Sequence, residues 1–312
     1  MAKRVSIINF KGGVGKTTLS TQLAAGLVRF HGARVLLVDV DHQSSLSIVC
    51  LGAGRWQEAV NAGQTISSVF KHFTDSSHRP GNDIIVENAI TNDRIGHYAA
   101  LDIVPASLEL DDLEIELTAT HQGNAIESEW RKRTLICSWI DRNEIDEAYD
   151  YILFDCPPAT KIVSQNAIAA SHCYVVPVVP EAVMERGAPH LVQMIRTGID
   201  RKMTALAAMG EDRASFVPET SLVGLAVTRI RTHGPAASGF TDDHTVHLRS
   251  LQRQWQSDLL QPYIHEGTGV SQALADNVPV FDRSNTQNIG YRQIDTMYEE
   301  LVEAIKDRVD AI

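Results

Sequence analysis

Cysteine and aromatic residues are scarce in this chain of 312 residues: there are four cysteines, and aromatics make up 6%. The cysteines are widely spread, and no C-x-x-C pair occurs, so the sequence predicts neither a zinc site nor a disulfide framework. Reduced thiols are the ordinary state in the cytoplasm, and we expect a cytoplasmic protein. The hydrophobic content of 44% and charged content of 21% are typical of a globular chain with a sizeable core.

Long apolar runs are also missing. No segment approaches the roughly 20 apolar residues that a membrane-spanning helix needs. The longest candidates, such as residues 174–179, are better interpreted as buried strands. We expect no signal peptide, because a strand pattern begins within a few residues of Met1.

Basic residues are fewer than acidic residues. Lysine and arginine total 28 against 39 acidic residues, which gives a formal net charge of −11. This balance excludes a uniformly basic nucleic-acid binder, but it leaves room for a local basic patch on an acidic surface.

The chain does contain one glycine-rich segment, Asn9 to Thr18, with the sequence NFKGGVGKTT. A buried strand pattern precedes it, and apolar residues at helical spacing follow it. Glycines let backbone N–H groups converge on phosphate oxygens at a helix N-terminus. In such a loop Lys16 serves the outer phosphates and the Thr17 hydroxyl serves magnesium. Lys11 lies too early for that work, which suggests that it reaches phosphates bound by another copy of the chain.

The chain otherwise alternates between apolar strands and helical segments, which predicts an α/β fold. The expected sheet is mostly parallel and twisted, with helices on both faces. We predict one domain over residues 1–312, with an insertion at about 52–100 and a C-terminal helix at about 286–312 docked on the core. Strands are expected at 5–8, 34–39, 101–105, 151–155, 173–179 and 222–228.

Acidic residues follow two of these strands. Asp39 and Asp41 end the second expected strand, and Asp155 ends the strand at 151–155, before Cys156 and two prolines. In open α/β sheets, ligands bind at the carboxyl ends of the strands. The acids are therefore placed to organise magnesium and water beside the glycine loop.

The segment KGGVGKTT fails the standard G-x-x-x-x-G-K-[ST] pattern, because Phe10 stands where the first glycine belongs. It resembles instead the deviant Walker A box of the ParA/MinD family of P-loop ATPases. Residues 39–43 resemble that family's D-x-D-P-Q switch, with His42 in place of proline, and residues 155–158 resemble its Walker B and second switch. The likeness extends to residues 104–107, 176–181 and 269–280, and region 52–100 is least covered.

The resemblance implies ATP and Mg²⁺ as cofactors and a set of site residues. Lys11, Lys16 and Asp41 would be catalytic: Asp41 would orient the attacking water, and Lys11 would cross a dimer interface. Thr17, Asp39 and Asp155 would serve the metal. The nucleotide would be held by Gly12, Gly13, Val14, Gly15, Lys16, Thr17, Thr18, Pro180 and Glu181.

The ParA branch implies a homodimer when ATP is bound, non-specific DNA binding on the nucleoid, slow hydrolysis, and a ParB-like or cargo-adaptor protein that raises the rate. Such a protein would partition a plasmid or chromosome or position another cargo. DNA contacts of this kind are made by lysine and arginine. The candidates are Arg229, Arg231, Arg249 and Arg253, with a further group at 196–202.

Two alternatives remain open at this point. A MinD-like positioning ATPase would bind membrane through a basic C-terminal helix. Residues 298–312 hold five acidic and two basic residues, and anionic lipid would repel a segment with this net negative charge. We therefore expect no membrane binding. The other alternative is a metabolic P-loop enzyme, an ATP-dependent ligase or synthase on the same fold.

Overall fold

The computed structural model describes residues 1–91, 96–159, 161–209, 216–233, 239–286 and 288–312. One sheet of seven parallel strands runs through it in the order β3-β2-β4-β1-β5-β6-β7. The α/β prediction is confirmed. The strands are β1 (Lys3–Ile7), β2 (Val35–Asp39), β3 (Leu101–Val104), β4 (Tyr151–Asp155), β5 (Cys173–Val178), β6 (Ser221–Val227) and β7 (Leu259–Leu260).

The sheet separates two hydrophobic cores. Successive side chains of a strand point to opposite faces, so a strand covered on both sides is apolar throughout. On β4, Leu153 joins one core, whereas Ile152 and Phe154 join the other. This double burial explains why the strand segments show no alternation of apolar and polar residues.

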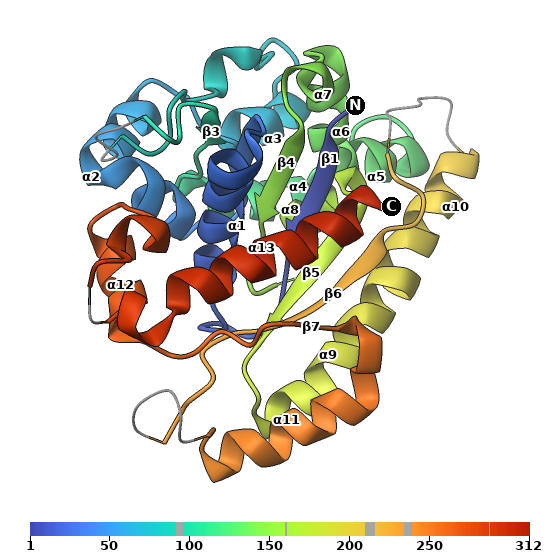
Figure 1. Cartoon of the computed structure of the whole chain (residues 1–312). Helices are drawn as coiled ribbons and strands as arrows, with labels where there is room; N and C mark the ends of the chain where they lie inside the picture. Colours follow the sequence, from blue (N-terminus) through green and yellow to red (C-terminus); the bar gives the residue numbers. More distant parts are fainter. Residues whose placement is uncertain (92–95, 160, 210–215, 234–238, 287) are drawn as a thin grey trace.

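One face is covered by α1 (Lys16–His31), α2 (Ser45–Asn61), α12 (Thr268–Ala275) and α13 (Ile294–Asp310), with α13 crossing in front of the sheet (Figure 1). Helix α13 packs closely on α1. A Cβ added at Gly26 of α1 would lie 2.7 Å from a methyl group of Val302, closer than real Cβ contacts come. Glycine at this position therefore lets the two helices approach, and the apolar side of α13 is buried.

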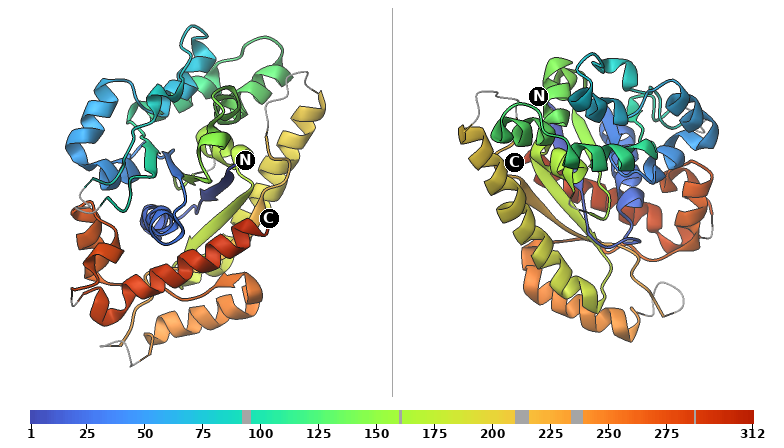
Figure 2. Two further views of the ribbon diagram at one scale, coloured as in Figure 1. Left: turned by 45° about the horizontal axis from the view of Figure 1, so that its top comes forward. Right: turned by 180° about the vertical axis from the view of Figure 1, so that it is seen from behind.

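The opposite face carries the remaining helices of the described residues, which the back view in Figure 2 brings forward. Helices α9 and α10 are joined by a π-helical turn, Ile195–Asp200, into one long element beside β5 and β6. Short 3₁₀ turns lie at Asn82–Ile84, Gln256–Asp258, Val280–Arg283 and Gly290–Arg292. The helices of this group are α3 (Ser67–Thr74), α4 (Glu109–Ala119), α5 (Ala125–Arg133), α6 (Leu135–Arg142), α7 (Ile145–Ala148), α8 (Ile162–Ala170), α9 (Ala182–Met194), α10 (Arg201–Met209) and α11 (Asp242–Trp255).

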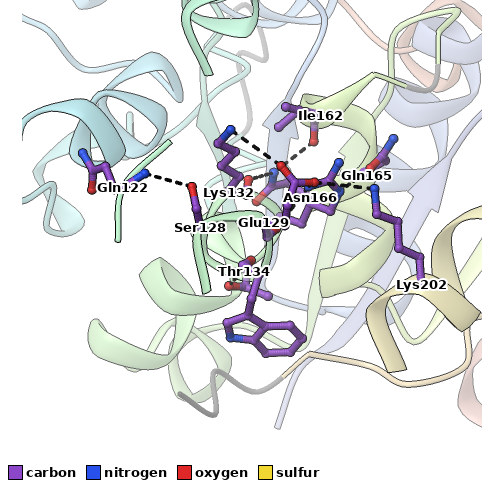
Figure 3. A network of polar contacts seen from close by, with 11 residues as sticks. Gln122, Ser128, Glu129, Lys132, Thr134, Ile162, Gln165, Asn166 and Lys202 are labelled. Atoms are coloured by element: carbon purple, nitrogen blue, oxygen red, sulfur yellow. Dashed lines mark hydrogen bonds and ion pairs between the residues drawn. The ribbon is translucent and has the colours of Figure 1, made fainter. Parts of the chain in front are cut away.

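Helices α5, α6 and α8 meet around one buried amide, Asn166 (Figure 3). Its oxygen accepts the N–H groups of Leu135 and Ile136 at 2.8 and 3.3 Å, where α6 begins. Its nitrogen donates to the carbonyls of Lys132 and Ile162 at 2.8 and 2.9 Å. The first N–H groups of α6 and the Lys132 carbonyl near the end of α5 lack partners within their helices, and this side chain satisfies them from α8.

The C-terminal helix starts later than predicted, at Ile294 rather than 286. Gln293, the residue before it, has a left-handed backbone (φ +55°), which a right-handed helix cannot include. Leu301, Ile305 and Val309 of this helix are buried, whereas Ile312 is 48% exposed because the helix ends at Asp310. Residue 287 lies outside the described residues.

The predicted insertion at about 52–100 contains the end of α2 and all of α3, and its residues 92–95 lie outside the described residues. Helix α2 is broken at Gly52, whose extended left-handed backbone (φ +74°, ψ +159°) is not helical. Asn277 donates to the carbonyls of Ile48 and Val49 at 2.8 Å just before the break. The interpretation of this region as an insertion stays a prediction.

Candidate nucleotide site

A cavity of about 520 Å³ lies at the carboxyl ends of the strands, where the glycine loop follows β1. This is the edge at which open α/β sheets bind ligands, and the volume suits a small molecule. The cavity contains most of the predicted loop residues together with the second switch and two segments after β6 and β7. It is lined by Gly12, Gly13, Gly15, Lys16, Thr17, Thr18, Asp41, Gln43, Ser45, Val49, Pro158, Thr228, Arg229, residues 264–267, Val270, Ser271, Leu274 and Tyr298.

The glycine loop has the backbone that phosphate binding requires. Gly13 and Gly15 have φ of +74° and +79°, which side-chain-bearing residues rarely adopt. Gly15 is the N-cap of α1, so the first N–H groups of this 16-residue helix face the loop. Helix N-termini attract anions through these N–H groups and through the helix dipole.

Lys16, the first residue of α1, is 8% exposed, and its Nζ donates to the carbonyl of Lys11 at 3.2 Å. Burial lowers the pKa of Lys16, while the nearby carboxylates of Asp155 and Asp41 act in the opposite direction. The Lys16 ammonium is thus held inside the loop and lines the cavity, and its contact with the outer phosphates stays a prediction.

Lys11 differs from Lys16 in the direction of its side chain. Its side chain leaves the loop and forms an ion pair with Glu181, just beyond β5. The hydrogen bond from Lys11 lowers the pKa of the Glu181 carboxyl. Among the described residues, the lining of the cavity includes neither Lys11 nor Pro180 nor Glu181. Contact of the last two with a nucleotide base stays a prediction.

Thr17 and Asp155 form the part of the site that suits magnesium. The Thr17 hydroxyl donates to Asp155 Oδ2 at 2.8 Å, and Ser20 donates to Oδ1 at 2.9 Å. With its proton directed at Asp155, the Thr17 hydroxyl keeps its lone pairs available for a cation. Burial raises the pKa of Asp155 to about 6, although these hydrogen bonds lower it. A nearby cation would therefore stabilise the ionised carboxylate.

Asp39 lies beneath the first switch. It is fully buried, and its Oδ2 accepts the N–H and hydroxyl of Ser47 at 2.9 and 2.7 Å. Its Oδ1 accepts the N–H of Asp41 at 3.1 Å. Burial, reinforced by the charge of Asp155, raises the pKa of Asp39 to about 8. In this structure Asp39 anchors the switch backbone, and Asp41 is the acid that lines the cavity.

Among the described residues, no three histidine, cysteine or acidic side chains gather as a metal cluster. This agrees with magnesium chemistry, since Mg²⁺ is usually held by one or two protein groups together with substrate phosphates. The Thr17 hydroxyl and Asp155 fit such a site. A bound Mg²⁺ would supply neutralisation of phosphate charge.

The segment after β6 was not predicted to lie at the cavity. Thr228 donates its hydroxyl hydrogen to the carbonyl of Val14 at 2.7 Å, and Arg229 Nη1 donates to the carbonyl of Gly13 at 2.6 Å. Glu266 accepts hydrogen bonds from Arg229 Nη2 at 2.7 Å and from Arg231 Nε at 2.9 Å. The signal available in the sequence was that Thr228 ends the expected strand at 222–228, because the carboxyl ends of parallel strands meet at one edge of the sheet.

The predicted DNA-binding arginines therefore fall into two groups. Arg229 and Arg231 share Glu266 near the cavity. Arg249 and Arg253 lie on the exposed side of α11, four residues apart, and line a shallow hollow with Val246 and Gln252. DNA contact by either group stays a prediction.

Comparison with known proteins agrees with this geometry. A family model described as "AAA domain" matches residues 2–208. The chromosome partitioning protein ParA of Caulobacter vibrioides is 31% identical over 224 residues, covering 72% of this chain and 68% of the relative. This chain belongs to the ParA/MinD family. The sporulation initiation inhibitor protein Soj of Bacillus subtilis is 34% identical over 197 residues, which cover 63% of this chain and 66% of Soj.

Solved structures share the fold. An ATP complex of McdA from Cyanothece has a TM-score of 0.67 at 19% identity, with 99% of this chain and 96% of McdA covered. Cobyrinic acid a,c-diamide synthase from Mycobacterium smegmatis, with ADP and magnesium, has a TM-score of 0.66 at 18% identity, with 100% and 96% covered. At these identities the likeness supports the fold alone, which McdA and the synthase share.

The family resemblance predicted from the glycine loop is thus confirmed, and this protein is a P-loop protein of the partition type. Helices in the described residues are either too short or too polar to cross a membrane. Dimerisation, DNA binding and stimulation by a partner stay predictions.

Proposed function

We propose that this protein is an ATP-driven partition switch that hydrolyses ATP slowly with Mg²⁺. Two ATP-bound copies pair face to face, the pair binds DNA without sequence preference, and a ParB-like or cargo-adaptor protein stimulates hydrolysis. The cargo is a plasmid, a chromosome or another large assembly. The protein acts in the cytoplasm, on the nucleoid.

The different placement of two lysines supports this proposal most directly. Lys16 is buried within its own phosphate loop, whereas the side chain of Lys11 is 32% exposed and paired with Glu181 outside the cavity. A lysine that does not serve its own phosphates, yet belongs to the same loop, is available to a second copy. If Lys11 left Glu181 and bound the phosphates of a nucleotide in a second copy, the pairing of the two copies would depend on ATP.

Hydrolysis depends on orienting water and neutralising charge more than on covalent chemistry. Lys16 and the loop N–H groups hold the phosphates. Asp41 lines the cavity, and its Oδ1 accepts the N–H of Gln43 at 3.0 Å, which fixes the carboxylate in the switch. Asp41 then orients the attacking water, and Asp39 holds the switch backbone in place.

For DNA, we propose Arg249 and Arg253 as the main contacts. Both are exposed on α11, and the Nε of Arg253 donates to the carbonyl of Arg249, so the two side chains leave one helical face. On a protein with a net charge of −11, such a patch is local, and pairing of two copies doubles it. Arg229 and Arg231 lie nearer the cavity and would contribute only at its rim.

The decisive experiment measures molecular size and DNA retention in the apo, ADP and ATP states. We expect a dimer and retained DNA with ATP and neither with ADP. A ligase or synthase would bind ATP without retaining DNA, and that result would overturn the proposal. Sedimentation with anionic vesicles tests the MinD-like alternative. We expect none, because the apolar side of α13 is buried on the core.

The double substitution Arg249→Ala with Arg253→Ala should weaken DNA retention in the ATP state. Each phosphate contact contributes about 0.9 to the slope of log affinity against log salt, so the slope should fall by about 2 if each arginine makes one such contact in the measured complex. A matched control removes two positive charges elsewhere, at Arg34 and Lys306. Arg34 is exposed, Lys306 is half-buried, and each forms an ion pair with an aspartate. Equal loss in both variants would show a net-charge effect and would contradict a specific patch on α11.

A further inference from the structure

Arg229 has three unusual properties at once. It lines the cavity, it spans from Glu266 to the carbonyl of Gly13, and it has a left-handed backbone (φ +54°) without being glycine. That conformation is uncommon for a side-chain-bearing residue and is strained, so it persists only where the surroundings enforce it. Backbone strain of this kind is concentrated at functional sites.

The contact with Gly13 bears on where the phosphate loop points its donors. In a trans peptide the C=O of one residue and the N–H of the next point in opposite directions. The bond from Arg229 Nη1 to the Gly13 carbonyl, 2.6 Å, therefore directs the N–H of Val14 away from Arg229. Thr228, bonded to the next carbonyl, directs the N–H of Gly15 in the same manner.

Glu266 holds the other side of the guanidinium. Its Oε1 accepts from Arg229 Nε and Nη2 at 3.2 and 2.7 Å, a two-point contact that fixes the guanidinium plane. Arg231 occupies Oε2 of the same carboxylate. The charges of Arg229 and Arg231 lower the pKa of Glu266 and oppose the effect of its burial. The carboxylate is thus an anchor for Arg229, although it lines a cavity meant for an anion.

We propose that Arg229 is a positioning residue of the nucleotide site: anchored by Glu266, it orients the peptide after Gly13 so that the loop N–H groups face the phosphates. This inference rests on the proposed nucleotide binding and adds a residue to it. Arg229 acts through the loop backbone, and it serves ATP and ADP alike.

The test compares Arg229→Gly with the wild type. Glycine adopts the left-handed backbone without strain, so this variant removes the guanidinium while favouring the native chain path. We expect the dissociation constants of fluorescent ATP and ADP analogues to rise about tenfold, the size expected from one charge-assisted hydrogen bond. The KM for ATP should rise alike, whereas kcat at saturating ATP stays within about twofold. The apo protein should melt at the wild-type temperature or higher.

Three further variants make the result specific. Arg229→Lys keeps the charge but not the fork, and should bind nucleotide between the wild type and Arg229→Gly. Glu266→Gln should weaken binding, and adding it to Arg229→Gly should cost nothing more, because Glu266 acts through Arg229. The control is Arg34→Ala, whose guanidinium is similarly exposed and pairs with Asp150 at 3.1 Å, beyond the other edge of the sheet. It should bind nucleotide as the wild type does.

The outcomes separate the two proposals. If the wild type binds no nucleotide, the proposed function fails. If the wild type binds and Arg229→Gly binds equally well, only the role of Arg229 fails. That role also fails if Glu266→Gln tightens binding or rescues Arg229→Gly, since Arg229 would then merely mask a carboxylate. A fall in kcat with KM unchanged would assign Arg229 to the chemical step and overturn a positioning role.

Discussion

The phosphate-loop edge of the sheet and the junction of α5, α6 and α8 both bury polar groups, but in different chemical states. At the junction, the neutral amide of Asn166 makes four hydrogen bonds to backbone groups (Figure 3). At the loop edge, the buried groups are ionisable. Burial lowers the pKa of Lys16 and raises those of Asp155 and Asp39, each toward the neutral form.

The difference in ionisation distinguishes a polar group that stabilises the fold from polar groups that can bind a ligand. A saturated neutral amide stabilises the fold and leaves nothing to exchange with a ligand. Buried charges destabilise the fold unless charges of opposite sign compensate them. Phosphates and Mg²⁺ would supply that compensation at the loop edge. Substitutions at the two places should therefore have opposite consequences for nucleotide binding and for stability.

The largest expected effect follows Lys16→Ala. Loss of the ammonium should weaken ATP binding by about 100-fold or more, about 2.7 kcal/mol, because phosphate charge is left uncompensated. Stability of the apo protein should be unchanged or slightly higher, since a buried charge is removed. Titration with a fluorescent ATP analogue and thermal unfolding measure the two effects. A variant that binds ATP normally would refute the assignment of the loop, and Lys71→Ala, a half-exposed lysine in an ion pair with Glu109, is the control.

Asp41→Ala should affect turnover rather than binding. Loss of the carboxylate that orients water should lower the hydrolysis rate by about 100-fold, within the range for a positioned acid or base. ATP affinity should change little, so ATP-bound dimers persist. Phosphate release under single-turnover conditions and size analysis at equal nucleotide saturation check this. Hydrolysis at the wild-type rate would remove Asp41 from its proposed role.

Asn166→Ala should show the reverse pattern. It leaves the N–H groups at the start of α6 and the Lys132 carbonyl without their partner, at a cost of about 2–4 kcal/mol in the free energy of unfolding. Nucleotide affinity of the folded fraction should stay unchanged. Urea denaturation measures the loss. Gln57→Ala, which removes an exposed amide bonded to Asn61 on α2, is the control and should cost under about 0.5 kcal/mol. Equal losses of stability in the two variants would contradict a structural role for Asn166.

The smallest expected effect concerns His172, beyond the amino ends of the strands. Its Nδ1 accepts the N–H of Arg4 at 3.0 Å, and burial, with the charge of Arg4, lowers its pKa to about 4. The unfolded chain titrates near 6.5, so this contribution is complete above about pH 6.5 and is lost as the pH falls toward 4. In His172→Asn, whose oxygen can still accept the bond, stability should fall less between pH 7 and 4.5. An identical pH slope in urea unfolding would contradict this.

Much of the site was readable from the chain because its signals are local. Lys16 and Thr17 follow the glycines directly, and Asp39, Asp41 and Asp155 end apolar strands, so a few neighbouring residues carry each prediction. The strands before β7 were predicted within one or two residues for the same reason. Strand β7 has only two residues, Leu259 and Leu260, and so short a strand has no period to detect. The late start of α13 depended on the backbone of Gln293, which helical spacing does not encode.

The sequence by itself determined the phosphate loop, the parallel sheet and the acids at its carboxyl edge, because spacing and residue type within short windows suffice for them. Only the tertiary structure decided what surrounds the loop. Lys11 pairs with Glu181, 170 residues away, and Arg229 reaches Gly13 across 216 residues. Contacts at such separations depend on which strands are neighbours: β5 and β6 follow β1 in the sheet, and their ends therefore meet the loop.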